Sequence, residues 1–257
     1  MVKRMVSLLM TGMLLFGAAA YAADTPSAAQ ESSRDGKAID RLTSMGHYLR
    51  GLKVFAVHAD ITKDEVLVNE QKLQFAGTAD YLVQTPNHLR LEVKNDRRHR
   101  TYTYNGETMT QYSPRIGYYA TMGVTGNLGE VVQQVKEKYD LDLPLADLFL
   151  WGTKKADPKD IKEAASIGAE RIGNQDCDHY AFRQENIDWQ IWIQQGKQPL
   201  PLKLVITTTD EASQPQYVAV LKWNLSPKLN KNDFRFIPPK HAKKIEIVPF
   251  NAAAENK

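Results

Sequence analysis

Histidine, cysteine and acidic side chains are the residues of this sequence most able to do chemistry, and their spacing does not gather them into a site. Asp178 and His179 are adjacent, but successive side chains of a strand point to opposite faces, so this pair does not predict a metal centre. There is no G-x-S-x-G and no H-E-x-x-H motif. We therefore predict no catalytic residue, no metal, no cofactor and no enzymatic activity, although triads form in space rather than along the chain. The six histidines are His47, His58, His88, His99, His179 and His241.

Cys177, the single cysteine, excludes an internal disulfide. It lies between Asp176 and Asp178, and adjacent carboxylates raise the pKa of a thiol. A catalytic thiolate needs a cationic neighbour instead. We interpret Cys177 as a buried or bystander residue.

A glycine-rich stretch, Gly123 to Gly129, precedes a predicted helix, and helix N-termini can bind anions. The stretch lacks the Lys-Ser/Thr pair of a P-loop and the spacing of a dinucleotide-binding loop. We interpret it as a helix cap, or as a hinge for a lid with Gly123, Gly126 and Gly129 as the hinge residues.

Charge gives no support for nucleic-acid binding. The formal charge is +3, and it falls to +1 when residues 1–22, which carry Lys3, Arg4 and no acid, are removed. The only basic run is Arg97-Arg98-His99-Arg100, which we interpret as a solvated turn in preference to a contact with phosphate or lipid headgroups.

The N-terminus has the pattern of a secretory signal peptide. Lys3 and Arg4 precede an apolar run, and small residues follow with an A-x-A site that predicts cleavage after Ala22. The apolar run is shorter than a membrane span, so we expect a periplasmic protein with no span after cleavage. The predicted divisions are a signal peptide at 1–22, a disordered lead-in at 23–33, a single β domain at 34–250 and a flexible tail at 251–257.

Residues 180–209 predict the middle of a large antiparallel sheet. Trp189, Ile191 and Ile193 share one face of a strand, and a turn at Gln195–Pro201 leads into a second strand. Asn105-Gly106 is the strongest short hairpin signal. The other strands are predicted at 54–62, with a turn at 63–65, and at 73–85, 89–93, 101–104, 108–112, 116–121, 169–172, 178–184, 216–225 and 234–238.

Helices are predicted where apolar residues recur at spacings of three and four: residues 37–52 and 128–139. Asn127 and Glu130 form a capping-box pattern. A short helix at 143–151 is apolar almost all round and must be buried, and a third is predicted at 157–165, with Asp157 as N-cap. The chain is therefore predicted to be mainly β (α+β), a curved antiparallel half-open barrel with helices covering its concave face.

Several stretches resemble a known family over nearly the whole mature chain: LQFAGTADYLVQTPNHLRLEV, TYTYNGETMTQYSP, LPLADLFLWG, CDHYAFRQENIDWQIWIQQGKQPLPLKLVITTT and FRFIPPKHA. They resemble the DUF2092 family of predicted periplasmic proteins and, more distantly, the lipoprotein carrier LolA and its receptor LolB. The resemblance implies about eleven strands and a helical lid over an apolar cavity, which in the carrier holds acyl chains. The carrier has an arginine before the Pro-Asn pair that helps to control its lid, whereas this chain has Thr85.

Two functions remain open from the sequence. The first is a non-enzymatic carrier or binder of a lipid or other hydrophobic ligand. The second is an envelope protein-interaction module with a filled core, in which an exposed Trp192 would mark a partner surface unless it lies under the first helix. An enzyme acting on envelope glycans or lipids is a weaker third. The candidate cavity residues are Val131, Val135, Leu145, Leu148, Phe149, Trp151, Trp189, Ile191 and Trp223.

Overall fold

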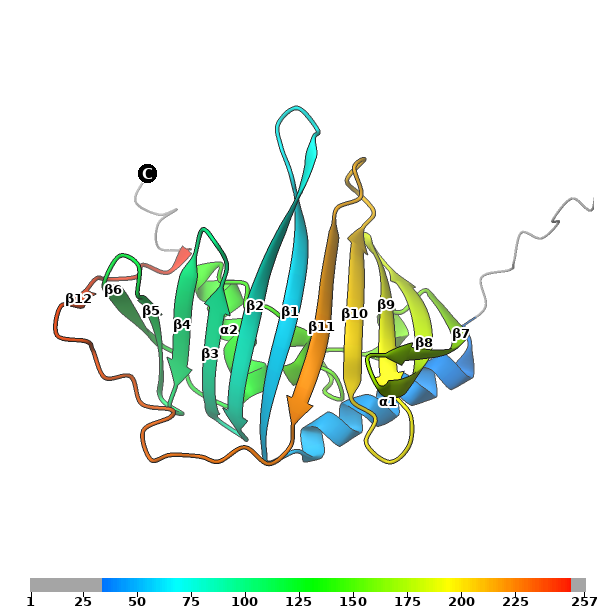
Figure 1. Cartoon of the computed structure of the whole chain (residues 1–257), viewed down its shortest axis with the longest axis horizontal. Coiled ribbons are helices and arrows are strands. Elements are labelled where there is room, and N and C mark those ends of the chain that lie inside the picture. Colours follow the sequence, from blue (N-terminus) through cyan, green and yellow to red (C-terminus); the bar gives the residue numbers. More distant parts are fainter. Residues whose placement is uncertain (1–33, 251–257) are drawn as a thin grey trace, which may run out of the picture. The chain divides into compact units, whose positions relative to one another are not determined.

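The structure, a computed structural model, describes residues 34–250, which form a single mixed sheet with helices on one side (Figure 1). The strand order is β12-β6-β5-β4-β3-β2-β1-β11-β10-β9-β8-β7, and all neighbours are antiparallel except the β12–β6 pair. The strands are β1 (Val54–Val66), β2 (Lys72–Gln84), β3 (His88–Lys94), β4 (His99–Tyr104), β5 (Thr108–Ser113), β6 (Tyr118–Gly123), β7 (Glu163–Ile172), β8 (Gln175–Gln184), β9 (Ile187–Gln194), β10 (Pro201–Thr208), β11 (Gln216–Asn224) and β12 (Lys243–Lys244). The helical elements are α1 (Gly36–Gly51), α2 (Leu128–Tyr139) and the 3-10 turns η1 (Ala146–Phe149) and η2 (Pro158–Asp160).

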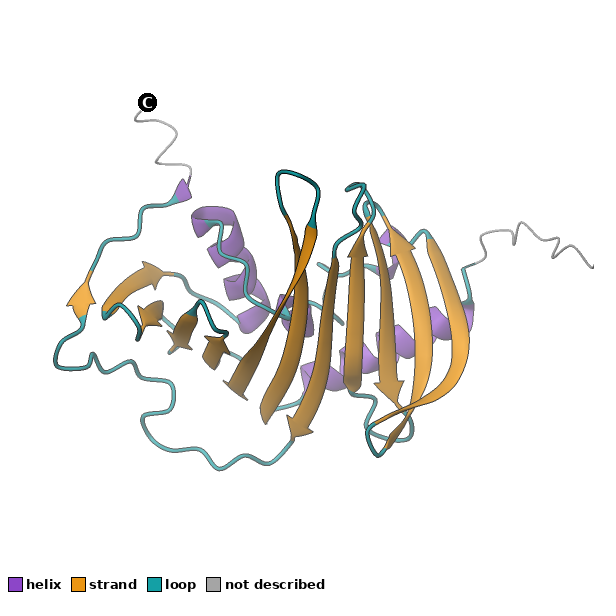
Figure 2. Ribbon diagram, turned by 45° about the horizontal axis from the view of Figure 1, so that its top comes forward, coloured by secondary structure: helices purple, strands orange, loops and turns teal. Residues whose placement is uncertain are grey.

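The predicted fold class is confirmed. Eleven longer strands and the two-residue β12 form a curved, open sheet, and α1 and α2 both lie on its concave side (Figure 2). We call this helix-covered side the inner face and the opposite side the outer face. Alternation decides which residues lie inside, since Val57 and Ala59 on β1 and Tyr81 and Val83 on β2 are buried in the core.

Helix α1 forms because its apolar residues fall on one side and its start is capped. Ala38, Leu42, Met45 and Leu49 are buried at spacings of three and four, and the Asp35 side chain accepts a hydrogen bond from the Lys37 N–H at 2.8 Å. The other Asp35 carboxylate oxygen accepts from the Ser166 N–H of β7 at 3.0 Å, which ties the helix start to the edge of the sheet.

Helix α2 begins at the predicted capping box: the Asn127 side chain accepts from the Glu130 N–H, and the Glu130 carboxylate accepts from the Asn127 N–H. The predicted helix at 143–151 is wrong, because only the η1 turn forms. Pro144 has no N–H to donate, and Leu145 lies in the left-handed region at φ 57°, which breaks the helical path. The chain therefore crosses the inner face as a compact irregular segment.

Three other sequence predictions are corrected. The helix at 157–165 is only η2, because β7 begins at Glu163 and pairs with β8; Asp157 does cap it. The predicted turn at 63–65 is part of β1, since Lys63 to Val66 pair with β2. Residues 234–238 form no strand and instead cross the outer face of β4–β6. The Asn105-Gly106 hairpin between β4 and β5 is confirmed.

The predicted signal peptide, lead-in and tail lie outside the described residues. Between residues 34 and 250, the helices are all too short or too polar to span a bilayer.

Candidate functional site

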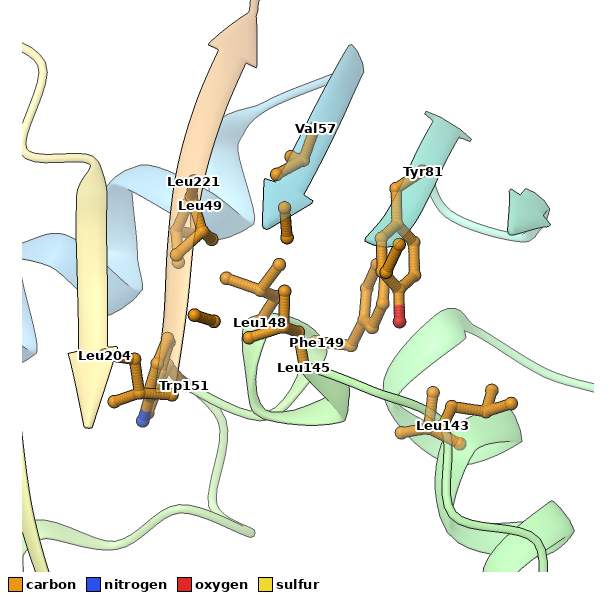
Figure 3. Packing of buried hydrophobic residues seen from close by; sticks show 14 of the residues in the cluster. Leu49, Val57, Tyr81, Leu143, Leu145, Leu148, Phe149, Trp151, Leu204 and Leu221 are labelled. Carbon is orange, nitrogen blue, oxygen red and sulfur yellow. The ribbon is translucent and has the colours of Figure 1, made fainter. Parts of the chain in front are cut away.

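The site is the contact between the inner face and the chain from α2 to Thr153, residues 128–153, which we call the lid. Its candidate residues lie together in one apolar cluster. Figure 3 shows Leu148 and Phe149 of η1 directed at the sheet, near Val57, Leu221 and Tyr81. The structure buries Val131, Val135, Leu145, Leu148, Phe149, Trp151, Trp189 and Ile191 and packs the partly buried Trp223 against them.

Aromatic contacts join the lid to two regions of the sheet. The Phe149 ring lies 5.8 Å from that of Tyr81 on β2, and the Trp151 ring stacks at 6.4 Å on Trp189 of β9. Trp189 also stacks on Phe182 of β8 at 4.3 Å. Rings at these separations attract one another beyond their area burial, so they join the C-terminal part of the lid to two regions of the sheet.

Polar contacts to main-chain carbonyls hold the lid as well. The Arg50 guanidinium at the end of α1 donates to the carbonyl oxygen of Phe149 at 2.9 Å and to that of Leu148. The Tyr81 hydroxyl donates to the carbonyl oxygen of Pro144. The sequence did not predict these two contacts. By its position Arg50 is an ordinary cation in the last turn of a helix, and Tyr81 is one more core residue of an alternating strand.

Glycines allow the lid to approach α1 very closely. A Cβ on Gly46 would lie 2.5 Å from the Gly152 nitrogen, and Gly152 has a φ of 77°. Among the predicted hinge glycines, a Cβ on Gly129 would lie 2.9 Å from the Phe149 carbonyl oxygen, and Gly126 has a φ of 121°. Gly123 has nothing within 4 Å of such a Cβ. Close packing thus explains why a glycine stands at position 129, and the positive φ explains why one stands at position 126.

Polar groups remain under the lid without partners. The Tyr217 hydroxyl of β11 and the Arg50 Nε atom are buried and form no hydrogen bond within residues 34–250. Burial raises the pKa of Asp147 on η1, and burial together with the nearby Asp147 carboxyl raises the pKa of Tyr217. A buried polar group without a partner is costly, so this interior contains unused hydrogen-bonding capacity.

Two cavities lie at the margins of the lid. One of about 240 Å³ is lined by Arg50, Phe149 and the N-terminus of α2, and the Thr85 side chain also reaches it. The Thr85 hydroxyl donates to the Leu52 carbonyl oxygen at 2.9 Å, so Arg50 rather than Thr85 contacts the lid here. The second, of about 310 Å³, lies beside Trp151 between the lid and α1.

An exposed Trp192 patch is contradicted by the structure. Trp192 lies on the face of β9 opposite to that of Trp189 but is only 4% exposed. The His179 ring stacks on it at 4.0 Å, and the Lys203 Nζ atom lies 4.2 Å from the centroid of its ring. Its indole N–H donates to Glu170 at 2.5 Å. The flanking strands cover the ring, which single-strand alternation does not reveal.

The other residues singled out from the sequence have structural roles. Cys177 is buried, as expected, and burial with the nearby carboxylates raises its pKa. Arg97 is exposed, lies 3.7 Å from the centroid of Phe75 and pairs with Glu65 at 3.0 Å. This contact fits the interpretation of the basic run as a surface turn.

Comparison with known proteins gives a family and several similar structures. A model of the family described as "Predicted periplasmic protein (DUF2092)" matches residues 38–248, which confirms the family resemblance predicted from the sequence. None of the curated proteins matches the chain.

The chain is also similar to solved structures at low identity. LprF from Mycobacterium bovis has a TM-score of 0.46 and 14% identity, covering 82% of this chain and 100% of that one. The lipoprotein LppX from Mycobacterium tuberculosis has a TM-score of 0.47 and 11% identity, covering 76% and 100%. A LolA superfamily protein from Nitrosomonas europaea has a TM-score of 0.34 and 10% identity, covering 77% and 97%.

Proposed function

The chain belongs to the DUF2092 family of predicted periplasmic proteins, and we propose that it is a non-enzymatic periplasmic binder or carrier of a hydrophobic molecule. The ligand, a lipid or a molecule with an acyl chain, lies between the inner face and the lid. The signal peptide is removed after Ala22, and the mature protein works without a membrane span.

The observation that carries this proposal is how the lid is held. Its apolar side chains lie on an apolar face, but its polar tethers are few: Arg50 to Leu148 and Phe149, Tyr81 to Pro144, and the Leu128 N–H to the Pro86 carbonyl oxygen at 2.9 Å. The lid consists of α2 and an irregular segment, and neither is paired with a strand, so its withdrawal breaks no sheet ladder. Moving such a cover away from a sheet costs less free energy than removing a strand, because a strand also loses its ladder of hydrogen bonds.

Volume indicates that binding needs the lid to move. Pockets for drug-sized ligands occupy about 300–1,000 Å³, and the two marginal cavities measure about 240 and 310 Å³. Neither holds a long acyl chain by itself. Withdrawal of Leu148 and Phe149 joins the marginal space to the inner face.

Replacing Leu148 and Phe149 on the inner face by an acyl chain changes the free energy little. Exposing Leu148 and Phe149 costs roughly 1.5–3 kcal/mol each, and each buried methylene of a ligand returns about 0.8 kcal/mol. About four to eight methylenes therefore offset the two side chains. Longer chains bind with a net gain, so affinity rises with chain length.

Two matched arginines on α1 test the role of the lid. Arg50 donates to lid carbonyls, whereas Arg41 donates to the Gln194 carbonyl oxygen of β9 at 2.6 Å, away from the lid. Hydrogen bonds from a charged group contribute about 1.5–3 kcal/mol each, so Arg50→Gln releases a fluorescent fatty acid about tenfold faster or more, and Arg41→Gln releases it at the wild-type rate. Equal release rates in the two variants contradict the lid assignment.

The alternative function is an envelope interaction module with a filled core. It is favoured by the complete burial of Val131, Val135 and Ile191, each 0% exposed. Under this alternative the mature protein contains no co-purified lipid and takes up no fatty acid probe. Crosslinking in the envelope then identifies a protein partner instead.

A further inference from the structure

A second site lies on the outer face, opposite to the lid. After β11 the chain crosses the outer face of β4–β6 before it pairs with β6 as β12, and we call residues 225–242 the strap (orange to red in Figure 1). Phe234 anchors it, 8% exposed and 5.4 Å from the His88 ring. Phe236 lies 5.5 Å from Tyr112 and 5.1 Å from Tyr119. These contacts hold the strap above the sheet.

Under the strap, hydroxyl groups form a ladder across three strands. Thr103, Thr110 and Thr121 are direct cross-strand neighbours on β4, β5 and β6. They face outward because the adjacent Tyr104 and Met109 are in the core. The Thr110 and Thr121 hydroxyl oxygens are 3.1 Å apart, and the threonines on β4 and β5 are each 7% exposed.

The strap and this ladder line an open cavity of about 290 Å³, which we call the strap pocket. Its polar lining includes the three threonines of the ladder, the Asn105 side chain, Tyr119 and Arg235. A hydroxyl can donate one hydrogen bond and accept two, so the single contact between Thr110 and Thr121 leaves most of their capacity available. The pocket therefore offers donors and acceptors together.

Its charge is positive. Arg235 is the cation of the lining, it is exposed, and it forms no ion pair within residues 34–250. Among the described residues, 34–250, no carboxylate lines the pocket. Asp233, two residues before Arg235, accepts a hydrogen bond from the Asn230 N–H at 2.6 Å. The guanidinium is thus free to bind an anion bidentately.

We propose that the strap pocket binds a polyhydroxylated ligand that carries an acidic group, which is the chemistry of an acidic or phosphorylated sugar unit. Its hydroxyl groups exchange hydrogen bonds with the threonine ladder and Asn105, while Arg235 binds its carboxylate or phosphate. The volume suits one such unit. This site is independent of the lid and of any hydrophobic ligand.

Titration calorimetry of the full mature chain tests the proposal with glucose, inorganic phosphate, glucuronate and glucose 6-phosphate as probes. We expect one or both acidic sugars to bind at least tenfold more tightly than either glucose or phosphate. Preference for glucuronate identifies a carboxylate ligand, and preference for glucose 6-phosphate identifies a phosphorylated one. Equal binding of all four probes, or of none, overturns the proposal.

Matched variants locate the binding. Arg235→Gln and the isosteric Thr110→Val should each weaken it at least tenfold, whereas Arg98→Gln in the exposed β3–β4 turn and Thr78→Val on β2 should not change it. Thermal unfolding of each variant verifies the fold. The lid variant Arg50→Gln should bind the acidic sugar as the wild type does. Unchanged binding in both Arg235→Gln and Thr110→Val contradicts the strap pocket.

Discussion

The contact between Gly46 and Gly152 gives a sharp test of how the lid packs on α1. In Gly46→Ala the new Cβ atom would lie 2.5 Å from the Gly152 nitrogen and 2.8 Å from its Cα atom, both of which belong to the main chain. A side chain could rotate away, but a backbone cannot. Ordinary contact at this point requires α1 and the end of the lid to separate by about 1 Å.

The magnitude follows from two opposing effects. Alanine is favoured over glycine inside a helix by about 0.8–1 kcal/mol. Overpacking costs about 1–3 kcal/mol, and the upper part of that range applies because main-chain atoms must move. The net expectation is a loss of about 2 kcal/mol in the free energy of unfolding.

Gly51 provides the matched control, since it lies on the same helix and a Cβ there would meet nothing within 4 Å. Gly51→Ala should stabilise the protein by about 0.4–1 kcal/mol through the unfolded state. Urea unfolding followed by tryptophan fluorescence measures both variants. If Gly46→Ala is as stable as Gly51→Ala, the described contact between α1 and the lid is wrong.

Three further predictions concern single side chains. Asn127→Ala removes the capping box and should cost about 1 kcal/mol in urea unfolding, whereas a neutral result would argue against the cap. Tyr217→Phe should be neutral or slightly stabilising, because the Tyr217 hydroxyl has no hydrogen-bond partner within residues 34–250. Tyr104→Phe loses the hydrogen bond that its hydroxyl donates to the Gly126 carbonyl oxygen at 2.8 Å, so it should lower the free energy of unfolding by about 1 kcal/mol. A larger loss of stability in Tyr217→Phe than in Tyr104→Phe would refute this ranking. The hydrogen bond that the His58 ring donates to the Asp80 carboxylate raises the pKa of His58, so Asp80→Asn should lower that pKa in an NMR titration, and an unchanged pKa would exclude the contact. Because the folded-state pKa is raised, the stability from this pair is fully present below the unfolded pKa of about 6.5 and is lost as pH rises through the folded value, so the two proteins should differ more at low pH than at high pH.

Local signals in the sequence predicted the elements whose form depends on local chemistry. The alternation around Trp189 and Ile191 predicts β9, and the turn that begins at Asn105 predicts a hairpin. Asn127 with Glu130 predicts the start of α2. In each case neighbouring residues decide the conformation, and tertiary contacts support the same choice.

Elements decided by distant partners were not predicted. Lys63 to Val66 are mostly polar and resemble a turn, but pairing with β2 extends the strand. Residues 143–151 have a helical pattern, but Leu145 at positive φ interrupts it. Phe234 and Phe236 alternate as in a strand, yet their rings anchor the strap.

The candidate site was predicted only in part, because some of its contacts join residues that are distant in the sequence. Burial of Leu148 and Trp189 follows from their apolar pattern, and the structure places both in one cluster. Arg50 gave no signal, because its role depends on lid carbonyls almost a hundred residues away in the chain. The hydrophobic periodicity of a sequence does not reveal polar residues whose hydrogen-bond partners are main-chain groups far along the chain.

Organic extraction and mass spectrometry of the mature protein purified from the periplasm test the central claim most directly. We expect a lipid or another molecule with an acyl chain, present in stoichiometric amount and reduced in Arg50→Gln but not in Arg41→Gln. An empty protein that also takes up no fluorescent fatty acid would contradict the account and favour the interaction module.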